Sequence, residues 1–252
     1  MAAPQAPVAD SIAPKNNYTG EKKQLKPTRH RHVWYVTGPA GCGKTTVASF
    51  IAGRYSVPYL EGDTFHPPAN ISKMAAGHPL TDSDRWDWLA RVRDAAVNTL
   101  SSTSSSSSAP TDGADPISTT SIDPPTHSAS STQASSHDPS SMDGTATPQA
   151  VVVTCSGLKK SYRDVLRSVP SGSGIKVHFV YLSLPEEVLY QRVRERVGHY
   201  MKESMVRSQI EVLEVPGQDE GDVVSVEAKE KKEVVEGEVR EGFERAMAQD
   251  EM

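Results

Sequence analysis

A glycine-rich octapeptide constrains this chain more than any other feature of its sequence. Residues Gly38 to Thr45 read Gly-Pro-Ala-Gly-Cys-Gly-Lys-Thr, directly after the apolar segment 33–37 and before a helical pattern over residues 45–55. This is the complete Walker A pattern in its strand, loop and helix setting. Glycines let backbone N–H groups turn inward around phosphate oxygens, and the N-terminus of the following helix attracts the same anion. The octapeptide therefore predicts a nucleotide phosphate site, against the alternative of a plain glycine-rich turn.

Individual residues of this loop have expected roles. Lys44 brings a positive charge to the β and γ phosphates of ATP, and the Thr45 hydroxyl is placed to bind Mg²⁺. Cys42 lies near a helix N-terminus, which can lower the pKa of a thiol and make it oxidisable, although a small residue is expected there simply for room. The expected nucleotide-binding residues are Gly38, Gly41, Cys42, Gly43, Lys44, Thr45 and Thr46.

Apolar segments alternate with helical patterns along the rest of the chain. The expected strands are 57–60, 151–154, 177–182 and 223–226, and the expected helices are 86–100, 162–168, 185–197 and 234–247. In the last of these helices an apolar residue recurs every fourth position, which suits packing on a sheet, at Val235, Val239, Phe243 and Met247. Nearly all-apolar strands that alternate with helices are typical of a parallel sheet covered on both faces. We expect an α/β, P-loop NTPase fold with a parallel sheet of about five strands, helices on both faces and a small lid.

Two segments of unusual composition stand outside this pattern. Residues 1–31 are rich in Ala, Pro, Lys and polar residues without a sustained period, and we expect a disordered N-terminal tail. Positions 101–150 contain 16 Ser and 8 Thr, and no Lys or Arg occurs between Arg93 and Lys159. Such a segment cannot bury enough apolar surface to offset its ordering entropy. We therefore expect a P-loop domain over residues 32–252, interrupted by a disordered Ser/Thr-rich insertion at about 101–150.

Charge and composition argue against several classes of partner. With 27 Lys and Arg against 32 Asp and Glu, the chain has no overall basic field for nucleic acid or an anionic membrane surface. No run of about 18 apolar residues occurs, as a membrane-spanning helix would need. Cys42 and Cys155 are too few for a disulfide framework and lack the paired spacing of a zinc site. We expect a cytoplasmic protein whose partners are small molecules, and the sequence leaves a homodimer open.

Two carboxylates follow the expected strand at 57–60. Glu61 and Asp63 are separated by one residue, so both can face the crevice that also holds the phosphate loop. One acid can help to hold Mg²⁺, and the other can accept the proton of an attacking hydroxyl. Asp63 is the candidate base and Glu61 the candidate metal ligand, with two solvated loop carboxylates as the alternative.

Several longer blocks surround these residues. The first has the pattern Gly-Asp-x-x-His-Pro-x-x-Asn-x-x-Lys-Met, from Gly62 to Met74, and the second runs from Gly77 to Arg85, followed by Trp88-Leu89. After the insertion come the blocks Cys155 to Asp164, Gly198-His199-Tyr200, Ser208-Gln209 and Leu213-Glu214-Val215-Pro216. In these blocks the chain resembles one family, the P-loop gluconokinases of the thermoresistant type. The resemblance covers nearly all of the expected folded part.

This resemblance implies a P-loop kinase that uses ATP and Mg²⁺ to phosphorylate the 6-hydroxyl of D-gluconate. The implied catalytic residues are Lys44, Asp63, Arg192 and Arg196. The two arginines lie four apart, on one face of a helix that leads into the lid, where they would neutralise charge on the transferred phosphoryl group. Gluconate has one carboxylate and several hydroxyls, so its site needs cationic anchors and polar partners. The candidates are Asp63, His66, Arg85, Lys159, Lys160 and Arg163, with a helix-surface basic cluster as the alternative for the last three.

The chain also departs from common patterns. The strand expected at 151–154 ends without the Walker B aspartate of many P-loop proteins, and Glu61 stands where the family more often has Asp. Two other functions stay open on the residues alone. One is a different small-metabolite kinase on this scaffold, such as a shikimate or nucleotide kinase, and the other is a nucleotide-binding module without turnover.

Overall fold

The computed structural model describes residues 18–101, 148–195 and 203–252, all of which belong to one structural unit of the chain. The tail expected over 1–31 lies outside the described residues up to position 17. The insertion expected over 101–150 lies outside them from 102 to 147. Disorder of these two segments stays a prediction.

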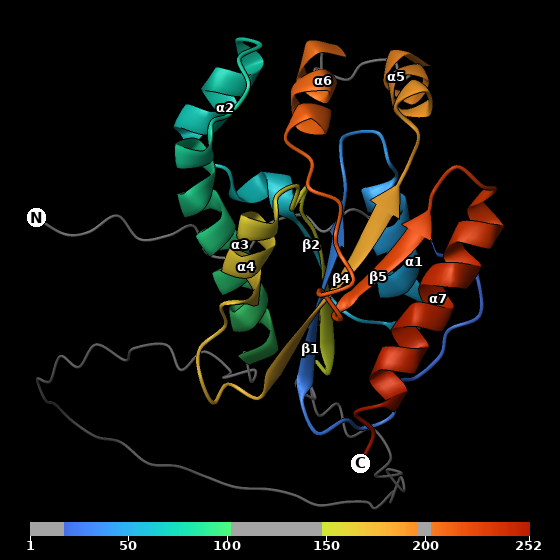
Figure 1. Cartoon of the computed structure of the whole chain (residues 1–252). Coiled ribbons are helices and arrows are strands. Elements are labelled where there is room, and N and C mark those ends of the chain that lie inside the picture. The colour runs from blue at the N-terminus through green and yellow to red at the C-terminus, as the bar shows by residue number, and fades with distance from the viewer. Residues whose placement is uncertain (1–17, 102–147, 196–202) are drawn as a thin grey trace, which may run out of the picture. The chain divides into compact units, whose positions relative to one another are not determined.

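Within the described residues, five parallel strands form one sheet in the order β2-β3-β1-β4-β5 (Figure 1). The strands are β1 (Arg31–Thr37), β2 (Tyr59–Glu61), β3 (Ala150–Thr154), β4 (Ile175–Ser183) and β5 (Val223–Glu227). This confirms the predicted α/β fold with its parallel sheet. β1 is central and pairs with β3 on one side and β4 on the other. The loop after β1 therefore leaves the sheet where the strand order reverses, which is where open α/β sheets bind ligands.

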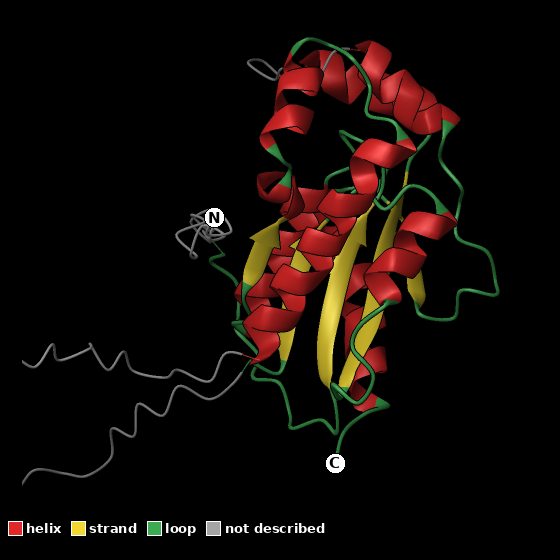
Figure 2. Cartoon of the chain, turned by 90° about the vertical axis from the view of Figure 1, so that its left-hand side faces the viewer, coloured by secondary structure: helices red, strands yellow, loops and turns green. Residues whose placement is uncertain are grey.

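Helices cover both faces of the sheet (Figures 1 and 2). One face is covered by α1 (Lys44–Tyr55) and α7 (Lys232–Ala248), and the other by α3 (Asp82–Ser101) and α4 (Lys160–Arg167). Side chains of β1 alternate between the two cores: Trp34 and Val36 point toward α1 and α7, whereas Val33 and Tyr35 point toward α3 and α4. The apolar stripe predicted in the last helix is buried in the first of these cores.

Smaller helices lie beyond the carboxyl ends of the strands (Figure 1). They are the 3-10 helix η1 (Gly62–Phe65), α2 (Pro68–Ala75), α5 (Glu186–Glu195) and α6 (Glu203–Glu211). The helix expected at 185–197 corresponds to α5, whereas α2 and α6 were not predicted. We call α5 and α6 the lid helices. None of the helices in the described ranges combines the length and hydropathy that a membrane-spanning segment needs.

Residues 18–30 were expected to belong to the tail, and the structure places them against α1 and the end of α7. The ring of Tyr18 contacts Phe50 edge-on at 5.9 Å between centroids, and Leu25 packs on the same core. The Lys23 N–H donates to the Arg54 carbonyl at 2.7 Å. These contacts lie far apart in the sequence and leave no periodic pattern in it.

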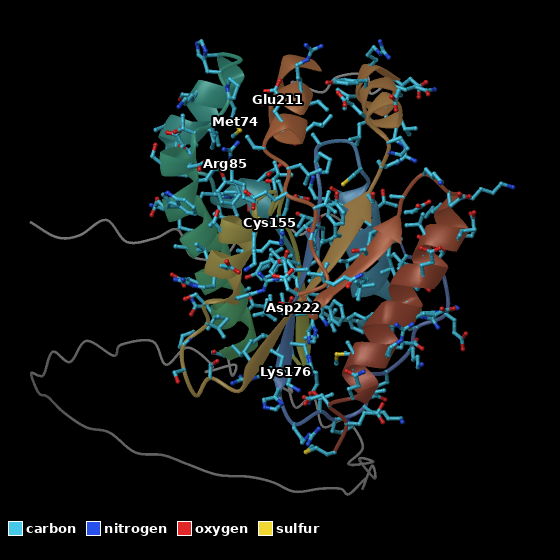
Figure 3. All side chains as sticks on the ribbon, viewed as in Figure 1. Met74, Arg85, Cys155, Lys176, Glu211 and Asp222 are labelled. Carbon is cyan, nitrogen blue, oxygen red and sulfur yellow. The ribbon has the colours of Figure 1, made fainter. Side chains whose placement is uncertain are left out.

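Three rings stack at the amino end of the sheet, of which His32 and Trp34 are buried and His178 is half-buried. His32 lies on His178, which in turn lies on Trp34, with centroids 5.1 and 4.4 Å apart. Asp250 and Lys176 carry charges close to these rings. The Lys176 ammonium lies 2.7 Å from the Asp250 carboxylate. Figure 3 shows Lys176 at this end of the sheet and Arg85 at the other end of the molecule. Burial lowers the pKa of both His32 and His178 to about 4, although Asp250 acts in the other direction.

These two histidines predict a loss of stability in mild acid. Between the ordinary histidine pKa of 6.5 and the folded-state pKa of about 4, the unfolded chain binds protons that the folded chain does not. The free energy of unfolding should therefore fall as pH decreases from about 6.5 to about 4. Urea unfolding at several pH values measures this, and His178→Gln should flatten the dependence. The same substitution at the exposed His78 is the control. An equal slope in both variants would contradict the prediction.

Candidate active site

A cleft of about 770 Å³ opens at the carboxyl end of the sheet. Its walls come from the phosphate loop, the segment after β2, helices α2 and α3, the loop after β3 and the lid helices. Figure 3 shows Arg85 and Met74 at this end of the molecule, with Glu211 on α6. The lining includes ten of the predicted site residues: Gly41, Gly43, Lys44, Thr45, Thr46, Glu61, Asp63, His66, Arg85 and Arg192.

The phosphate loop has the backbone that its glycines predict. Gly38 and Gly43 have φ values of 135° and 101°, in a region that side chains with a Cβ rarely adopt. Gly43 is the N-cap of α1, and the first turn of this helix contains no acidic residue. The Lys44 ammonium lies 3.0 Å from the carbonyl oxygens of both Gly38 and Pro39. Amides, a helix N-terminus and a lysine therefore converge in one anion-binding loop.

Two residues of this loop lie beneath it and do not line the cleft. A methyl group on Gly38 would lie 2.8 Å from the Cys42 sulfur and 2.9 Å from the Leu182 carbonyl oxygen. The Cys42 thiol is buried, and this burial raises its pKa even though Lys44 is close. The suggestion of a lowered pKa and an oxidisable thiol was therefore wrong. Cys42 packs against the underside of the loop, next to Gly38.

The Thr45 hydroxyl and the Glu61 carboxylate meet at the floor of the cleft. Thr45 Oγ1 lies 3.4 Å from Glu61 Oε2. Tyr59 and Thr154 also donate to the Glu61 carboxylate through their hydroxyls. Burial, followed by this hydrogen bond, raises the pKa of Tyr59. In the described ranges no group of three or more His, Cys, Asp and Glu side chains forms a protein-only metal site. One carboxylate and one hydroxyl suit Mg²⁺, which usually completes its shell with phosphate oxygens and water.

Asp63 stands at the mouth of the cleft on a firmly held turn. The preceding Gly62 lies so close to β3 that a methyl group there would overlap the Thr154 carbonyl oxygen. The Trp88 indole N–H donates to the Gly62 carbonyl at 2.8 Å, which fixes the same peptide from the other side. Among the described residues no side chain donates to the Asp63 carboxylate, which is exposed in the cleft. This carboxylate is therefore available to a ligand.

His66 is a neutral polar group in the wall of the cleft. Its ring stacks on Trp88 with centroids 4.3 Å apart and planes 13° apart. Burial, together with the nearby charge of Arg85, lowers the pKa of His66 to about 4. His66 can therefore exchange hydrogen bonds with a hydroxyl group without adding charge near pH 7.

The predicted basic residues separate into two groups. Arg85 lines the cleft, where its Nη1 donates to the Tyr162 hydroxyl at 3.3 Å. Lys159 and Lys160 do not line it: the Lys159 ammonium pairs with Asp82 at 2.7 Å, and that of Lys160 lies 3.2 Å from the Asp164 carboxylate. Hydrogen bonds from Lys159 lower the pKa of the Asp82 carboxyl. Two of the expected substrate cations are thus neutralised by neighbouring carboxylates.

Arg163 is a structural residue, which corrects its interpretation as a substrate anchor. It is 1% exposed, and its guanidinium forms a two-point pair with Glu220 at 2.6 and 2.8 Å. Its Nη1 donates to the carbonyl oxygens of Gly157 and Glu214 at 3.0 and 3.1 Å. Hydrogen bonds from Arg163 lower the pKa of the Glu220 carboxyl to about 2. Because its donors are used inside the protein, Arg163 holds the loop after β3 to the segment before β5.

Of the two predicted lid arginines, the structure describes only Arg192. Arg192 lines the cleft from α5, and its Nη2 donates to the Ala228 carbonyl oxygen at 2.8 Å. Arg196 lies outside the described residues.

Other residues of the cleft had no role assigned from the sequence. They include Met74, Leu80, Trp88, Ser156, Leu158, Glu195 and Gln209. Trp88 and Gln209 belong to blocks that resemble the gluconokinases, and that membership was the only signal for them. Their contacts join segments far apart in the chain, so local spacing does not reveal them.

The structural role of Arg163 predicts a large loss of stability in Arg163→Met. The substitution removes two charge-assisted hydrogen bonds from the buried Glu220, which keeps only Arg167 at 2.7 Å, and this is expected to cost about 1.5–3 kcal/mol of unfolding free energy. Lys160→Met on the same helix is the control, because exposed ion pairs contribute only about 0–1 kcal/mol. Urea unfolding measures both. Losses of similar size in the two variants would contradict the assignment.

Comparison with known proteins places this site in a family. A family model described as an AAA domain matches residues 33–216. A probable gluconokinase of Schizosaccharomyces pombe is 37% identical over 85% of this chain and 90% of its own length. The thermoresistant gluconokinase of Escherichia coli is 31% identical, over 81% of this chain and 89% of its own length.

Solved structures agree with these sequence matches. A crystal structure of a gluconokinase from Sinorhizobium meliloti superposes with a TM-score of 0.61 at 31% identity, covering 88% of this chain and 96% of the other. A sugar kinase from Janibacter superposes with a TM-score of 0.62 at 29% identity, covering 88% of this chain and 98% of the other. With its P-loop, its parallel sheet and relatives that it matches over about nine tenths of their length, the chain belongs to the gluconokinase family.

Proposed function

We propose that this protein transfers the γ-phosphoryl group of ATP to the 6-hydroxyl of D-gluconate. The observation that carries the proposal is the meeting of two kinds of group in one cleft. Lys44 and Thr45 lie on the nucleotide side, and Asp63, His66 and Arg85 lie on the other side. The family membership of the chain supports the same substrate.

On the nucleotide side, the amides of the phosphate loop receive the β and γ phosphates, and Lys44 turns its ammonium to them. Thr45 and Glu61 would hold Mg²⁺, since their oxygens lie 3.4 Å apart beside the loop. When bound, this ion neutralises charge on the phosphate oxygens. Glu61, the last residue of β2, would supply the carboxylate, since the neighbouring strand β3 ends in Thr154 and has no aspartate there.

On the substrate side, Asp63 accepts the proton of the attacking hydroxyl. The hydroxyl oxygen then forms its bond to the γ phosphorus while the bond from that phosphorus to the β–γ bridging oxygen breaks. ADP leaves with the bridging oxygen, and the proton leaves from Asp63. Lys44 and Arg192 stabilise the negative charge on the transferred group. Arg196 is proposed to assist from the residue range that the structure does not describe.

Arg85 is the proposed anchor of the gluconate carboxylate. Its side chain is 11% exposed, and it lines the cleft without a close carboxylate partner, since the nearest Asp82 oxygen is 4.0 Å away. A guanidinium in a partly buried wall binds a carboxylate by paired hydrogen bonds. Neutral His66 beside it is suited to a sugar hydroxyl. Lys159 contributes by holding Asp82, which also accepts a hydrogen bond from the Tyr162 hydroxyl, rather than by binding substrate.

The catalytic roles predict large effects for two substitutions. Lys44→Ala and Asp63→Asn should each lower the kcat of gluconate phosphorylation by roughly a hundredfold to ten-thousandfold, while the protein stays folded. A coupled assay with ATP, Mg²⁺ and gluconate measures this. Asp87→Asn, which changes an exposed carboxylate on α3, is the matched control. Near-normal turnover of Asp63→Asn would show that another group accepts the proton.

The anchor role predicts a charge-specific effect of Arg85→Met. The KM for gluconate should rise by about ten- to a hundredfold, because a hydrogen-bonded pair of charges contributes about 1.5–3 kcal/mol. The KM for ATP should not change. Activity on D-glucitol, which lacks the carboxylate, should be affected much less than activity on gluconate. Arg91→Met, at an exposed position of α3, is the control. Equal losses with both sugars would refute the assignment.

A further inference from the structure

One hydrogen bond joins the lid directly to the phosphate loop. The backbone N–H of Ala40, the third residue of the loop, donates to Oε1 of Gln209 at 2.8 Å. Gln209 belongs to α6 and is 169 positions away in the sequence. Both residues line the cleft.

Among the described residues, α5 also approaches the loop, mainly through apolar side chains. A methyl group placed on Gly41 would lie 3.0 Å from Val193 Cγ2 and 3.7 Å from the Leu189 carbonyl oxygen. Leu189 and, on α6, Val206 are buried in the core that also contains Val47 of α1. These contacts hold the lid near the loop but have no directional preference. Gln209 adds the directional contact.

The orientation of the Gln209 amide follows from its partner. Because the Ala40 N–H is a donor, the Gln209 oxygen must face it, and the Nε2 group points the other way. Because the Ala40 N–H donates to Gln209, the backbone amides that can bind phosphate are those that follow it, toward Lys44 and the start of α1. The contact can therefore persist while a nucleotide is bound.

We propose that Gln209 is a positioning residue that fastens α6 to the phosphate loop and keeps water from the transferred phosphoryl group. The inference rests on the proposed kinase function. A kinase must favour the substrate hydroxyl over water, and it does so by closing the site around the γ-phosphoryl group. A helix held to the phosphate loop itself moves with the nucleotide site, so closure and phosphate position are linked.

The test compares Gln209→Leu, which removes the acceptor, with Gln209→Glu, which keeps an acceptor for the Ala40 N–H. Gln191→Leu is the matched control, because Gln191 is an exposed lid glutamine whose amide donates to Glu195. Two quantities are measured: the ratio of ADP released to gluconate phosphorylated, and amide hydrogen exchange of the loop peptide 38–44 without nucleotide. Thermal unfolding verifies that each variant is folded.

Gln209→Leu should raise the ratio of ADP to phosphorylated gluconate and the exchange rate at Ala40 by about tenfold, the effect of losing one hydrogen bond. Gln209→Glu and Gln191→Leu should stay within about twofold of the native protein in both measurements. Unchanged exchange in Gln209→Leu would overturn the contact, and faster exchange with an unchanged ratio would overturn the role in water exclusion. If the native protein did not phosphorylate gluconate, the proposed function would fail, and the exchange measurement would still decide the contact.

Discussion

The site depends on the burial of β1 on both of its faces. Trp34 and Val36 on one face and Val33 and Tyr35 on the other are fully buried, so the strand has little freedom to move relative to its neighbours. The phosphate loop begins directly after this rigid strand. Its first residue is also fixed, because the Gly38 N–H donates to the Ser156 carbonyl in the loop after β3. A loop that is held in this way can present its amides to phosphate without first being ordered, which reduces the entropy lost on binding.

Pairing of charges decides which cations remain available for ligands. Arg163 is held by Glu220, Lys159 by Asp82 and Lys160 by Asp164. Lys44 and Arg192 line the cleft without a carboxylate partner among the residues that the structure describes, and Arg85 lies 4.0 Å from the nearest oxygen of Asp82. Arg163 joins α4 to the loop after β3 and to the segment before β5, Lys159 links the start of α4 to α3, and the Lys160–Asp164 pair lies within α4. The cluster of basic residues at 159–163 therefore builds the wall behind the site, and the positive charge inside the cleft comes from α1, α3 and the lid.

The fold and the phosphate site were largely predictable because their signals are local. The Walker A octapeptide, the apolar strands and the four-residue stripe of α7 each fall within a short window of sequence, and the structure has each of them in its expected setting. Pro58 immediately precedes β2, an edge strand, which agrees with the tolerance of proline at such positions. Helices α2 and α6 were missed because they are short and their packing partners lie in distant segments.

The sequence by itself determined the class of chemistry, because a glycine-rich loop between a strand and a helix binds phosphate whatever surrounds it. It also provided the two carboxylates after β2. Only the tertiary structure decided which side chains share the cleft: it buried Arg163, paired Lys159, placed Trp88 behind Gly62 and brought Gln209 to Ala40. The physical reason is that the partners of a polar side chain, often more than fifty positions away, decide whether its hydrogen-bonding groups face the protein or the ligand.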